Sequence, residues 1–298
     1  MARKPKIGVA LGSGGARGWC HIGALKGLQR LGVEIDVVAG SSVGAVVGAA
    51  FAGGKLDALE AWVLALTQGR FVTLMDLSLR SGGLIKARQV EILLKSLGLP
   101  AEIEDFELPF AAIATDMETG REVWLTKGPS YRAVRASAGI PGLMTPVKLG
   151  ERWLIDGGLV NPVPVSAARA LGADVIISVN PNARRHGKIW MAPDPKPAAP
   201  WLARLLPEAL HDPLGIDPEP AAKEVTPNYF AVVSASLDIM SDTIRRARMA
   251  GDPPHIALEA HITDLTVLEL YRGAEAIAEG ERIVLAQAEA IREVCGLA

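Results

Sequence analysis

The chain has 298 residues, of which 49% are hydrophobic and 21% are charged, a composition typical of one large globular domain or two small ones. Its 31 basic and 33 acidic residues give a formal net charge of -2, which excludes a strong overall attraction to nucleic acid or to anionic lipid. Two cysteines, Cys20 and Cys295, form neither a disulfide framework nor a metal-ligand pattern. Because the apolar run after the basic N-terminus, Ile7 to Gly12, is too short for a signal peptide, we expect a cytoplasmic protein.

Two strand, turn and helix units open the chain. Residues 6–11 form a short apolar run that leads into a glycine loop at 12–15, and helical spacing follows. A second apolar run, 35–39, leads into a glycine-bounded turn at 40–44 and another helical stretch. Strands that alternate with helices in this way predict a mainly parallel sheet that helices cover on both faces.

The next part of the chain adds an antiparallel portion to this pattern. Two amphipathic helices are expected at 59–66 and 90–97. Strands are expected at 108–115, 121–126 and 175–179, and another helix is expected at 163–171. Ser81-Gly82-Gly83 marks a loop between the two amphipathic helices. Asn161 and Pro162 predict the start of the last helix, with Asn as N-cap and Pro at the first helical position.

The composition changes at Asn180. Prolines are frequent from there to Pro227, and this excursion carries an apolar, helix-like patch at 201–210. Helical spacing then returns over 237–244 and, as one long terminal helix, over 267–291. We therefore expect a three-layer α/β/α fold with a mostly parallel central sheet: a core over 8–180, and a Pro-rich excursion with C-terminal helices over 181–298 that belong to the same globular unit.

The turn Gly40-Ser41-Ser42-Val43-Gly44 matches the nucleophile-elbow pattern G-x-S-x-G, directly after an apolar strand and before a helix of small residues. A sharp turn presents the central hydroxyl, and the glycines on either side allow the chain to bend and pack closely. The start of the following helix supplies partial positive charge for a developing anion. The sequence therefore predicts Ser42 as a nucleophile; the alternative is an ordinary Gly/Ser turn.

A serine nucleophile also needs a base and preorganised donors for an oxyanion. The backbone N–H groups of Gly14, Gly15 and Ala16 can supply the donors, with Arg17 as a nearby cation. The same loop could cradle a phosphate, but Arg17 stands where a dinucleotide fingerprint needs glycine, and no P-loop motif is present. Asp156, in Leu154-Ile155-Asp156-Gly157-Gly158, is the candidate base, although Asp before Gly is also common in plain turns.

The order of these motifs resembles the patatin-like phospholipase family, specifically its bacterial members. Gly-Gly-x-Arg-Gly follows the first strand, Gly-x-Ser-x-Gly follows the second, and Asp-Gly-Gly comes later in the chain. Further matches are His21 to Leu25, Ala114-Thr115-Asp116, Ala136-Ser137 ahead of Pro141, and Asp156 to Pro164. The match runs from about residue 8 to 180, and it departs from the usual three glycines at Ser13.

The resemblance implies a serine acyl hydrolase with a Ser-Asp dyad, in which Ser42 attacks an acyl carbonyl and Asp156 accepts its proton. It assigns the oxyanion hole to the amides of Gly14, Gly15 and Ala16, and a phospholipid, a lysophospholipid or a simple carboxylic ester to the substrate. Arg17 could contact a lipid phosphate or pair with a carboxylate. Ser137 and Asp116 are expected to shape the floor of the site and a strand end. No metal or organic cofactor is implied.

A conventional triad would use a histidine instead. His186, His211, His255 and His261 follow Asp156 in the order that α/β-hydrolases require, but none lies in a recognisable motif. His21 is expected to be a packing or hydrogen-bonding residue.

Two other functions remain open at this point: a non-enzymatic lipid- or membrane-docking regulator on the same scaffold, and a nucleotide-binding α/β protein that uses the first glycine loop. The patch from Trp190 to Leu210, with Arg184, Arg185 and Lys188 upstream, could rest transiently on a membrane surface or cover the acyl site, which would place the protein at the membrane periphery. Arg245, Arg246 and Arg248 are expected on a solvated helix face. No nucleic-acid partner is expected.

Overall fold

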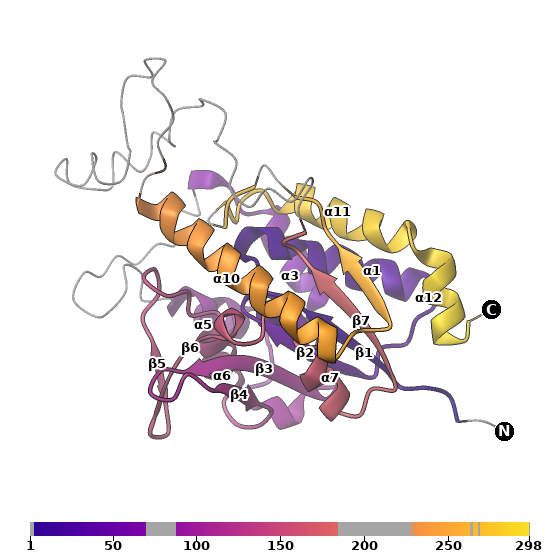
Figure 1. Ribbon diagram of the computed structural model, residues 1–298, viewed down its shortest axis with the longest axis horizontal. Helices are drawn as coiled ribbons and strands as arrows, with labels where there is room; N and C mark the ends of the chain where they lie inside the picture. The colour runs from indigo at the N-terminus through magenta and orange to yellow at the C-terminus, as the bar shows by residue number, and fades with distance from the viewer. Residues whose placement is uncertain are drawn as a thin grey trace, which may run out of the picture.

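One sheet forms the middle layer of the protein (Figure 1). The computed structural model describes residues 3–69, 88–183, 227, 229–262, 265–267 and 269–297. The strands are β1 (Ile7–Leu11), β2 (Val37–Ser41), β3 (Phe110–Asp116), β4 (Glu122–Leu125), β5 (Val147–Leu149), β6 (Arg152–Asp156), β7 (Val175–Asn180) and β8 (Ile256–Glu259). They follow the order β5-β6-β3-β2-β1-β7-β8, with β4 paired to β3. The neighbouring strands β3, β2, β1, β7 and β8 are parallel to one another. Strands β4 and β6 each pair with β3 in the antiparallel sense, and β5 pairs with β6 in the same way.

Helices cover both faces of this sheet. They are α1 (Cys20–Arg30), α2 (Val43–Ala52), α3 (Leu56–Leu64), α5 (Arg88–Ser96), α6 (Ser130–Ser137), α7 (Val165–Ala170), α10 (Tyr229–Gly251), α11 (Gly273–Leu285) and α12 (Ala288–Cys295). Short 3-10 turns lie at η1 (Gly15–Trp19), η2 (Ile103–Asp105) and η3 (Gly157–Leu159). The predicted α/β/α class with a mostly parallel sheet and a helical C-terminal part is confirmed.

Alternate residues of each strand point into two cores of different size. On β1, Val9 and Leu11 join a large cluster with α1, α2, α11 and α12, whereas Ala10 joins a smaller one with α7. Met249 of α10 packs against the smaller cluster. Figure 1 shows α7 and α10 on one side of the sheet and α1 and α3 on the other.

Helix α11 packs closely against α1 through glycines. A Cβ on Gly23 would lie 1.9 Å from the carbonyl oxygen of Ile277, and a Cβ on Gly280 would lie 1.9 Å from that of Cys20. Only glycine fits at both crossing points. The C-terminal helices therefore share the large core with β1 and α1.

Two predicted elements differ from the structure, and one strand was not predicted. Helix α7 begins at Val165, not at Pro162, because the Asn161 amide donates to Glu122 (2.7 Å) and Ser166 (3.2 Å) and caps no helix. The predicted terminal helix is two helices, α11 and α12, with its first residues outside them. Strand β8 was not predicted, since four residues of mixed polarity carry little strand signal.

The predictions for 81–83 and for 184–210 lie outside the described residues. Within the described part of the chain, no helix has both the length and the apolar character that a membrane span needs.

Candidate active site

Ser42 lies in a strained turn between β2 and α2. Its φ is 58° and its ψ is -126°, and it is the one non-glycine residue with positive φ in the described part of the chain. The flanking glycines are needed for close approach: a Cβ on Gly40 would lie 2.3 Å from the Gly44 oxygen, and one on Gly44 would lie 2.2 Å from the Leu11 oxygen. The Ser137 hydroxyl accepts a hydrogen bond from the Ser42 N–H at 3.0 Å. Tight packing against β1 therefore holds the elbow in its unfavourable conformation.

The pairing of β3 explains why Asp156 lies beside this elbow. Strand β4 pairs with residues 112–115 of β3, β2 pairs with 110–113, and β6 pairs with 114–116. Because β4 overlaps both of the others, it must lie on the opposite edge of β3 from each of them. Strands β2 and β6 therefore follow one another along one edge, and Ser41 and Asp156 stand opposite successive residues of β3.

The Ser42 hydroxyl donates to Asp156 Oδ2 at 2.6 Å. Both residues are almost fully buried, with 4% and 5% of their surfaces exposed. The other carboxylate oxygen, Oδ1, accepts from the Gly158 N–H at 2.7 Å, and the Thr115 hydroxyl donates to the Asp156 carbonyl at 2.7 Å. The carboxylate is thereby oriented from two sides, with one oxygen left for the serine.

Burial raises the pKa of Asp156 from its ordinary value of 3.8 to about 6, although the hydrogen bonds from Ser42 and Gly158 act in the opposite direction. A carboxylate with a higher pKa is a stronger base. It still remains ionised at pH 7, so the arrangement suits proton transfer from a hydroxyl.

The glycine loop that follows β1 is held from both ends. The Gly12 N–H donates to Val179 O at 2.9 Å and the Ser13 N–H to Pro162 O at 2.8 Å, while Asn182 donates to Ser13 O at 2.7 Å. Ser13, the departure from the family pattern, lies against the Asp156 loop, since a Cβ on Gly158 would be 2.8 Å from its hydroxyl oxygen. The loop thus borders the Ser42 and Asp156 pair.

Two of the three predicted oxyanion donors remain available. The N–H groups of Gly14 and Gly15 donate to no protein acceptor among the described residues, whereas the Ala16 N–H donates to Val267 O at 3.0 Å. Gly15 has a φ of +55°, and a Cβ there would lie 2.5 Å from the same Val267 oxygen. The segment around Val267 therefore fixes this turn and uses one donor that the sequence assigned to the oxyanion.

Arg17 points into the protein. Its Nη2 contacts the Asp238 carboxylate at 3.1 and 3.2 Å, and its Nε donates to Gly14 O at 3.4 Å. Both side chains of this ion pair are largely buried. In this structure Arg17 links the glycine loop to α10, and the predicted contact with a lipid phosphate would need this pair to separate.

His21 also supports the glycine loop, as predicted for a hydrogen-bonding residue. Its Nε2 lies 2.7 Å from Gly12 O, so Nε2 carries the proton and donates. Burial lowers the pKa of His21 to about 4, which keeps the ring neutral at pH 7. Neither Ser42 nor Asp156 contacts it through a hydrogen bond.

The other described histidines also lie apart from the dyad. His255 Nδ1 accepts from the Ile176 N–H at 3.0 Å beside the sheet, and the His261 N–H donates to Glu279. His186 and His211 lie outside the described residues. Within the described chain, the Asp156 carboxylate is bonded to Ser42 and Gly158, not to a histidine.

Asp116 lies at the end of β3, where its carboxylate accepts from the N–H groups of Glu118 (2.9 Å) and Thr119 (3.3 Å) and closes the turn to β4. One of the three arginines of α10 differs from the prediction. Arg245 pairs with Glu259 and its side chain is only 17% exposed, so the expectation of a solvated face is wrong for this residue. Arg248 pairs with Glu122 but is 39% exposed, and Arg246 is 72% exposed, so both reach solvent as expected.

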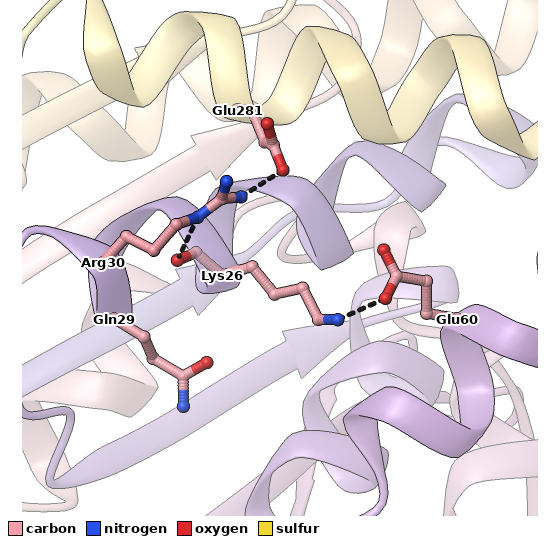
Figure 2. A pocket seen from close by; sticks show the side chains of 5 residues that line it. All are labelled: Lys26, Gln29, Arg30, Glu60 and Glu281. Atoms are coloured by element: carbon pink, nitrogen blue, oxygen red, sulfur yellow. Dashed lines mark hydrogen bonds and ion pairs between the residues drawn. The ribbon is translucent and has the colours of Figure 1, made fainter.

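A surface groove of about 480 Å³ lies between α1, α3 and α11 (Figure 2). Lys26 points toward Glu60 and Arg30 toward Glu281, each as an ion pair, and Gln29 points away from both pairs. None of these residues belongs to the Ser42, Asp156 or glycine-loop segments. Because every charge in the groove has an opposite partner, we assign it no part in the chemistry.

Comparison with known proteins identifies the family of this chain. The sequence profile of the patatin-like phospholipase family matches residues 9–169, which include Ser42, Asp156 and the glycine loop. An uncharacterized NTE family protein of Mycobacterium tuberculosis strain H37Rv is 32% identical over 96% of this chain and 92% of its own. The chain belongs to the patatin-like phospholipase family, a membership that supports a lipid hydrolase.

Eukaryotic relatives are much longer. Patatin-like phospholipase domain-containing protein 7 of Mus musculus is 33% identical over 60% of this chain and 14% of its own length. The lysophospholipase NTE1 of Coccidioides immitis is 34% identical over 58% of this chain and 11% of its own. Among solved structures, VipD from Legionella pneumophila aligns with 97% of this chain and 67% of its own at 12% identity and a TM-score of 0.46.

Proposed function

We propose that the protein is a serine acyl hydrolase that cleaves a carboxylic ester bond of a phospholipid or lysophospholipid through Ser42 and Asp156. The 2.6 Å hydrogen bond between the Ser42 hydroxyl and the Asp156 carboxylate is the observation that supports this most strongly. It joins a nucleophile in a strained elbow to a base that the fold orients on both sides. The family and the name of the fungal lysophospholipase support a lipid as the substrate.

The reaction would proceed in two halves. In the first, Asp156 accepts the Ser42 proton while Ser42 Oγ attacks the acyl carbonyl, and the N–H groups of Gly14 and Gly15 stabilise the oxyanion. Collapse of this intermediate breaks the ester bond, and Asp156 returns the proton to the leaving alcohol. In the second half, Asp156 accepts a proton from water, the water oxygen attacks the acyl-enzyme, and the fatty acid leaves as Ser42 regains its proton.

The first turn of α2 adds to this stabilisation. Its N-terminus begins at Val43, directly after the nucleophile, and carries the positive end of the helix dipole. The helix is buried, so the dipole acts in a medium of low dielectric constant. Helix α2 therefore compensates in part for the Ala16 donor that Val267 occupies.

Hydrolysis of lysophosphatidylcholine and of a short p-nitrophenyl ester, with the products identified by mass spectrometry, tests this proposal. Ser42→Ala should lower both rates by about 10⁴-fold or more. Ser41→Ala is the matched control: Ser41 is the adjacent, fully buried serine, its hydroxyl contacts no hydrogen-bond partner in the described structure, and its loss should leave both rates unchanged. Equal rates for wild type and Ser42→Ala would contradict the proposal.

If the activity is confirmed, we expect the enzyme to act from the cytoplasm, with at most a peripheral contact to the membrane that holds its substrate.

A further inference from the structure

Helix α10 carries five charged side chains, of which Asp242 and Arg246 pair with each other within the helix. The other three each contact a side chain of opposite charge on another element of the protein. These pairs are Asp238 with Arg17 (3.1 Å), Arg245 with Glu259 (3.5 Å) and Arg248 with Glu122 (2.7 Å). A helix on a water-soluble surface normally turns its apolar residues inward and its charges outward.

The opposite side, which we call the outer face of α10, consists of Val232, Ser236, Ile239, Met240 and Thr243. Val232, Ile239 and Met240 are each 49% exposed. The two hydroxyls on this face donate back to the helix itself, from Ser236 to Val232 O (2.8 Å) and from Thr243 to Ile239 O (2.9 Å). Between Val232 and Thr243 the outer face therefore carries no charge, and its two hydroxyl donors are already used.

The inner side of the same helix contacts both loops of the candidate active site. The Ser241 hydroxyl donates to Gly158 O at 3.3 Å, next to Asp156, and Asp238 holds Arg17 at the end of the glycine loop. A cavity of about 10 Å³, room for one water molecule, lies between α10 and the segment of Pro162, Asn180 and Asn182. Figure 1 shows the helix lying across the sheet on this side. Helix α10 therefore lies between the outer face and the loops that would carry the reaction.

We propose that the outer face of α10 is the surface with which this protein rests on a lipid bilayer. The inference rests on the proposed function, because a hydrolase of membrane lipids must bring its active-site loops to the bilayer. An uncharged face about three turns long is typical of helices that lie in the membrane interface. Arg246, whose side chain is 72% exposed and pairs with Asp242 at 2.8 Å, lies one turn beyond Thr243, where an anionic headgroup would compete with Asp242 for it.

A second copy of the chain fits this face less well. Three half-exposed apolar side chains supply far less than the roughly 1,200 Å² that a stable interface between two proteins buries. Reversible attachment to a bilayer has no such requirement, since a few apolar side chains combined with a cation suffice for weak binding.

An environment-sensitive fluorophore at position 239 tests the assignment directly. The Ile239→Cys variant is labelled with a nitrobenzoxadiazole probe, and Leu285→Cys, at a 64% exposed position on α11, is the matched control. The native Cys20 and Cys295 are buried, and burial raises the pKa of both thiols, so they should remain unlabelled. On addition of phosphatidylcholine vesicles that contain phosphatidylglycerol, we expect a blue shift at position 239 and none at position 285.

Two other results would overturn the inference. If the probe at position 239 is blue-shifted before vesicles are added, the protein itself covers the face; dependence of that shift on protein concentration would identify a second copy. If the probe reports water both before and after vesicle addition, the bilayer does not contact α10.

Replacing the apolar residues gives the complementary test. Ile239→Ser combined with Met240→Ser should weaken vesicle binding about tenfold, whereas Leu285→Ser should not change it. Hydrolysis of the short soluble ester should stay at the wild-type rate in both variants. Vesicle binding by the double variant at the wild-type level would contradict the proposed surface.

The outcomes separate this inference from the proposed function. Ester hydrolysis without a response at position 239 would contradict the bilayer surface and leave the enzyme assignment intact. A vesicle response without hydrolysis of any ester would support the surface and contradict the enzyme assignment.

Discussion

The two sides of the sheet are held together by different forces. On the side of α1 and α11, backbones meet through glycines: Cβ atoms at Gly23 and Gly280 would each lie 1.9 Å from a carbonyl oxygen of the partner helix. On the other side, α10 is attached chiefly by polar contacts, among them the pair of Arg17 with Asp238 and the hydrogen bond from Ser241. Only a small apolar cluster lies between α7 and the sheet there.

This difference indicates which parts of the site are fixed. Close apolar packing has no alternative arrangement of similar energy, so the elbow that packs on β1 keeps its strained geometry. Polar contacts between side chains can exchange for other contacts more easily than interlocked backbones can, although the buried pair of Arg17 with Asp238 costs more to separate than an exposed pair does. We therefore expect Ser42 and its surroundings to be rigid and α10 to be the more adjustable element of the site, and the following substitutions test that contrast.

The largest effect is expected from adding one methyl group on the glycine-packed side. Gly280→Ala would place a Cβ against the backbone of Cys20, which cannot move aside, and should lower the free energy of unfolding by about 3 kcal/mol or more. Gly251→Ala, at the end of α10, has open space around it and should be neutral or slightly stabilising. Urea unfolding of both variants makes the comparison; similar losses would show that the two sides do not differ as described.

The buried carboxylate of Asp156 should make the difference in stability between the wild type and Asp156→Asn depend on pH. Because folding raises the pKa of Asp156 from 3.8 to about 6, the native state of the wild type loses stability as the pH rises through this window. The amide that replaces the carboxyl in Asp156→Asn cannot ionise, so this variant should gain about 3 kcal/mol relative to wild type between about pH 3.5 and about pH 7.5.

Urea unfolding at the two pH values measures this gain, and no relative change would mean that the Asp156 carboxyl is not desolvated. The same pKa predicts that hydrolysis by the wild type falls below about pH 6, where Asp156 becomes protonated and can no longer accept the serine proton.

On the polar side, Asp238→Asn should cost about 2 kcal/mol, since it removes the carboxylate that contacts the buried Arg17 guanidinium. Lys4→Gln is the control, because the pair of Lys4 with Glu34 is exposed and its loss should have no measurable effect. Thermal unfolding of both variants at low and high salt distinguishes them. A salt-sensitive, near-zero effect of Asp238→Asn would show that its ion pair is no more than a surface contact.

A smaller effect is expected where the rigid side supports the nucleophile. Ser137→Ala removes the acceptor of the Ser42 N–H and should lower kcat about tenfold with little change in KM, because it disturbs the position of the hydroxyl and not the binding of substrate. Ser137→Thr keeps the acceptor and should retain most of kcat. Equal losses in both variants would point to altered packing instead.

The parts of the site that the sequence predicted are those encoded by consecutive residues. A G-x-S-x-G turn after an apolar strand predicts an elbow, and Asp156 in Asp-Gly-Gly is the candidate base. Strands β2 and β6 pair with successive parts of the same edge of β3, and this arrangement brings Asp156 to Ser42. The sequence could not show it, because strand pairing depends on residues far apart in the chain.

The same limit applies to α10 and to the oxyanion donors. Local patterning predicts that Arg245 faces water, whereas its partner Glu259 becomes a neighbour only in the folded chain. Nothing near Ala16 in the sequence indicates that Val267 accepts its N–H. Long-range partners thus decide which charges and donors are free.

Labelling with a serine-reactive fluorophosphonate, followed by peptide mass spectrometry, tests the pairing of Ser42 with Asp156 most directly. The account predicts an adduct on Ser42 of the folded wild type that forms far more slowly in Asp156→Asn. An unlabelled wild type, or an equal labelling rate in both proteins, would contradict the assignment of an activated serine.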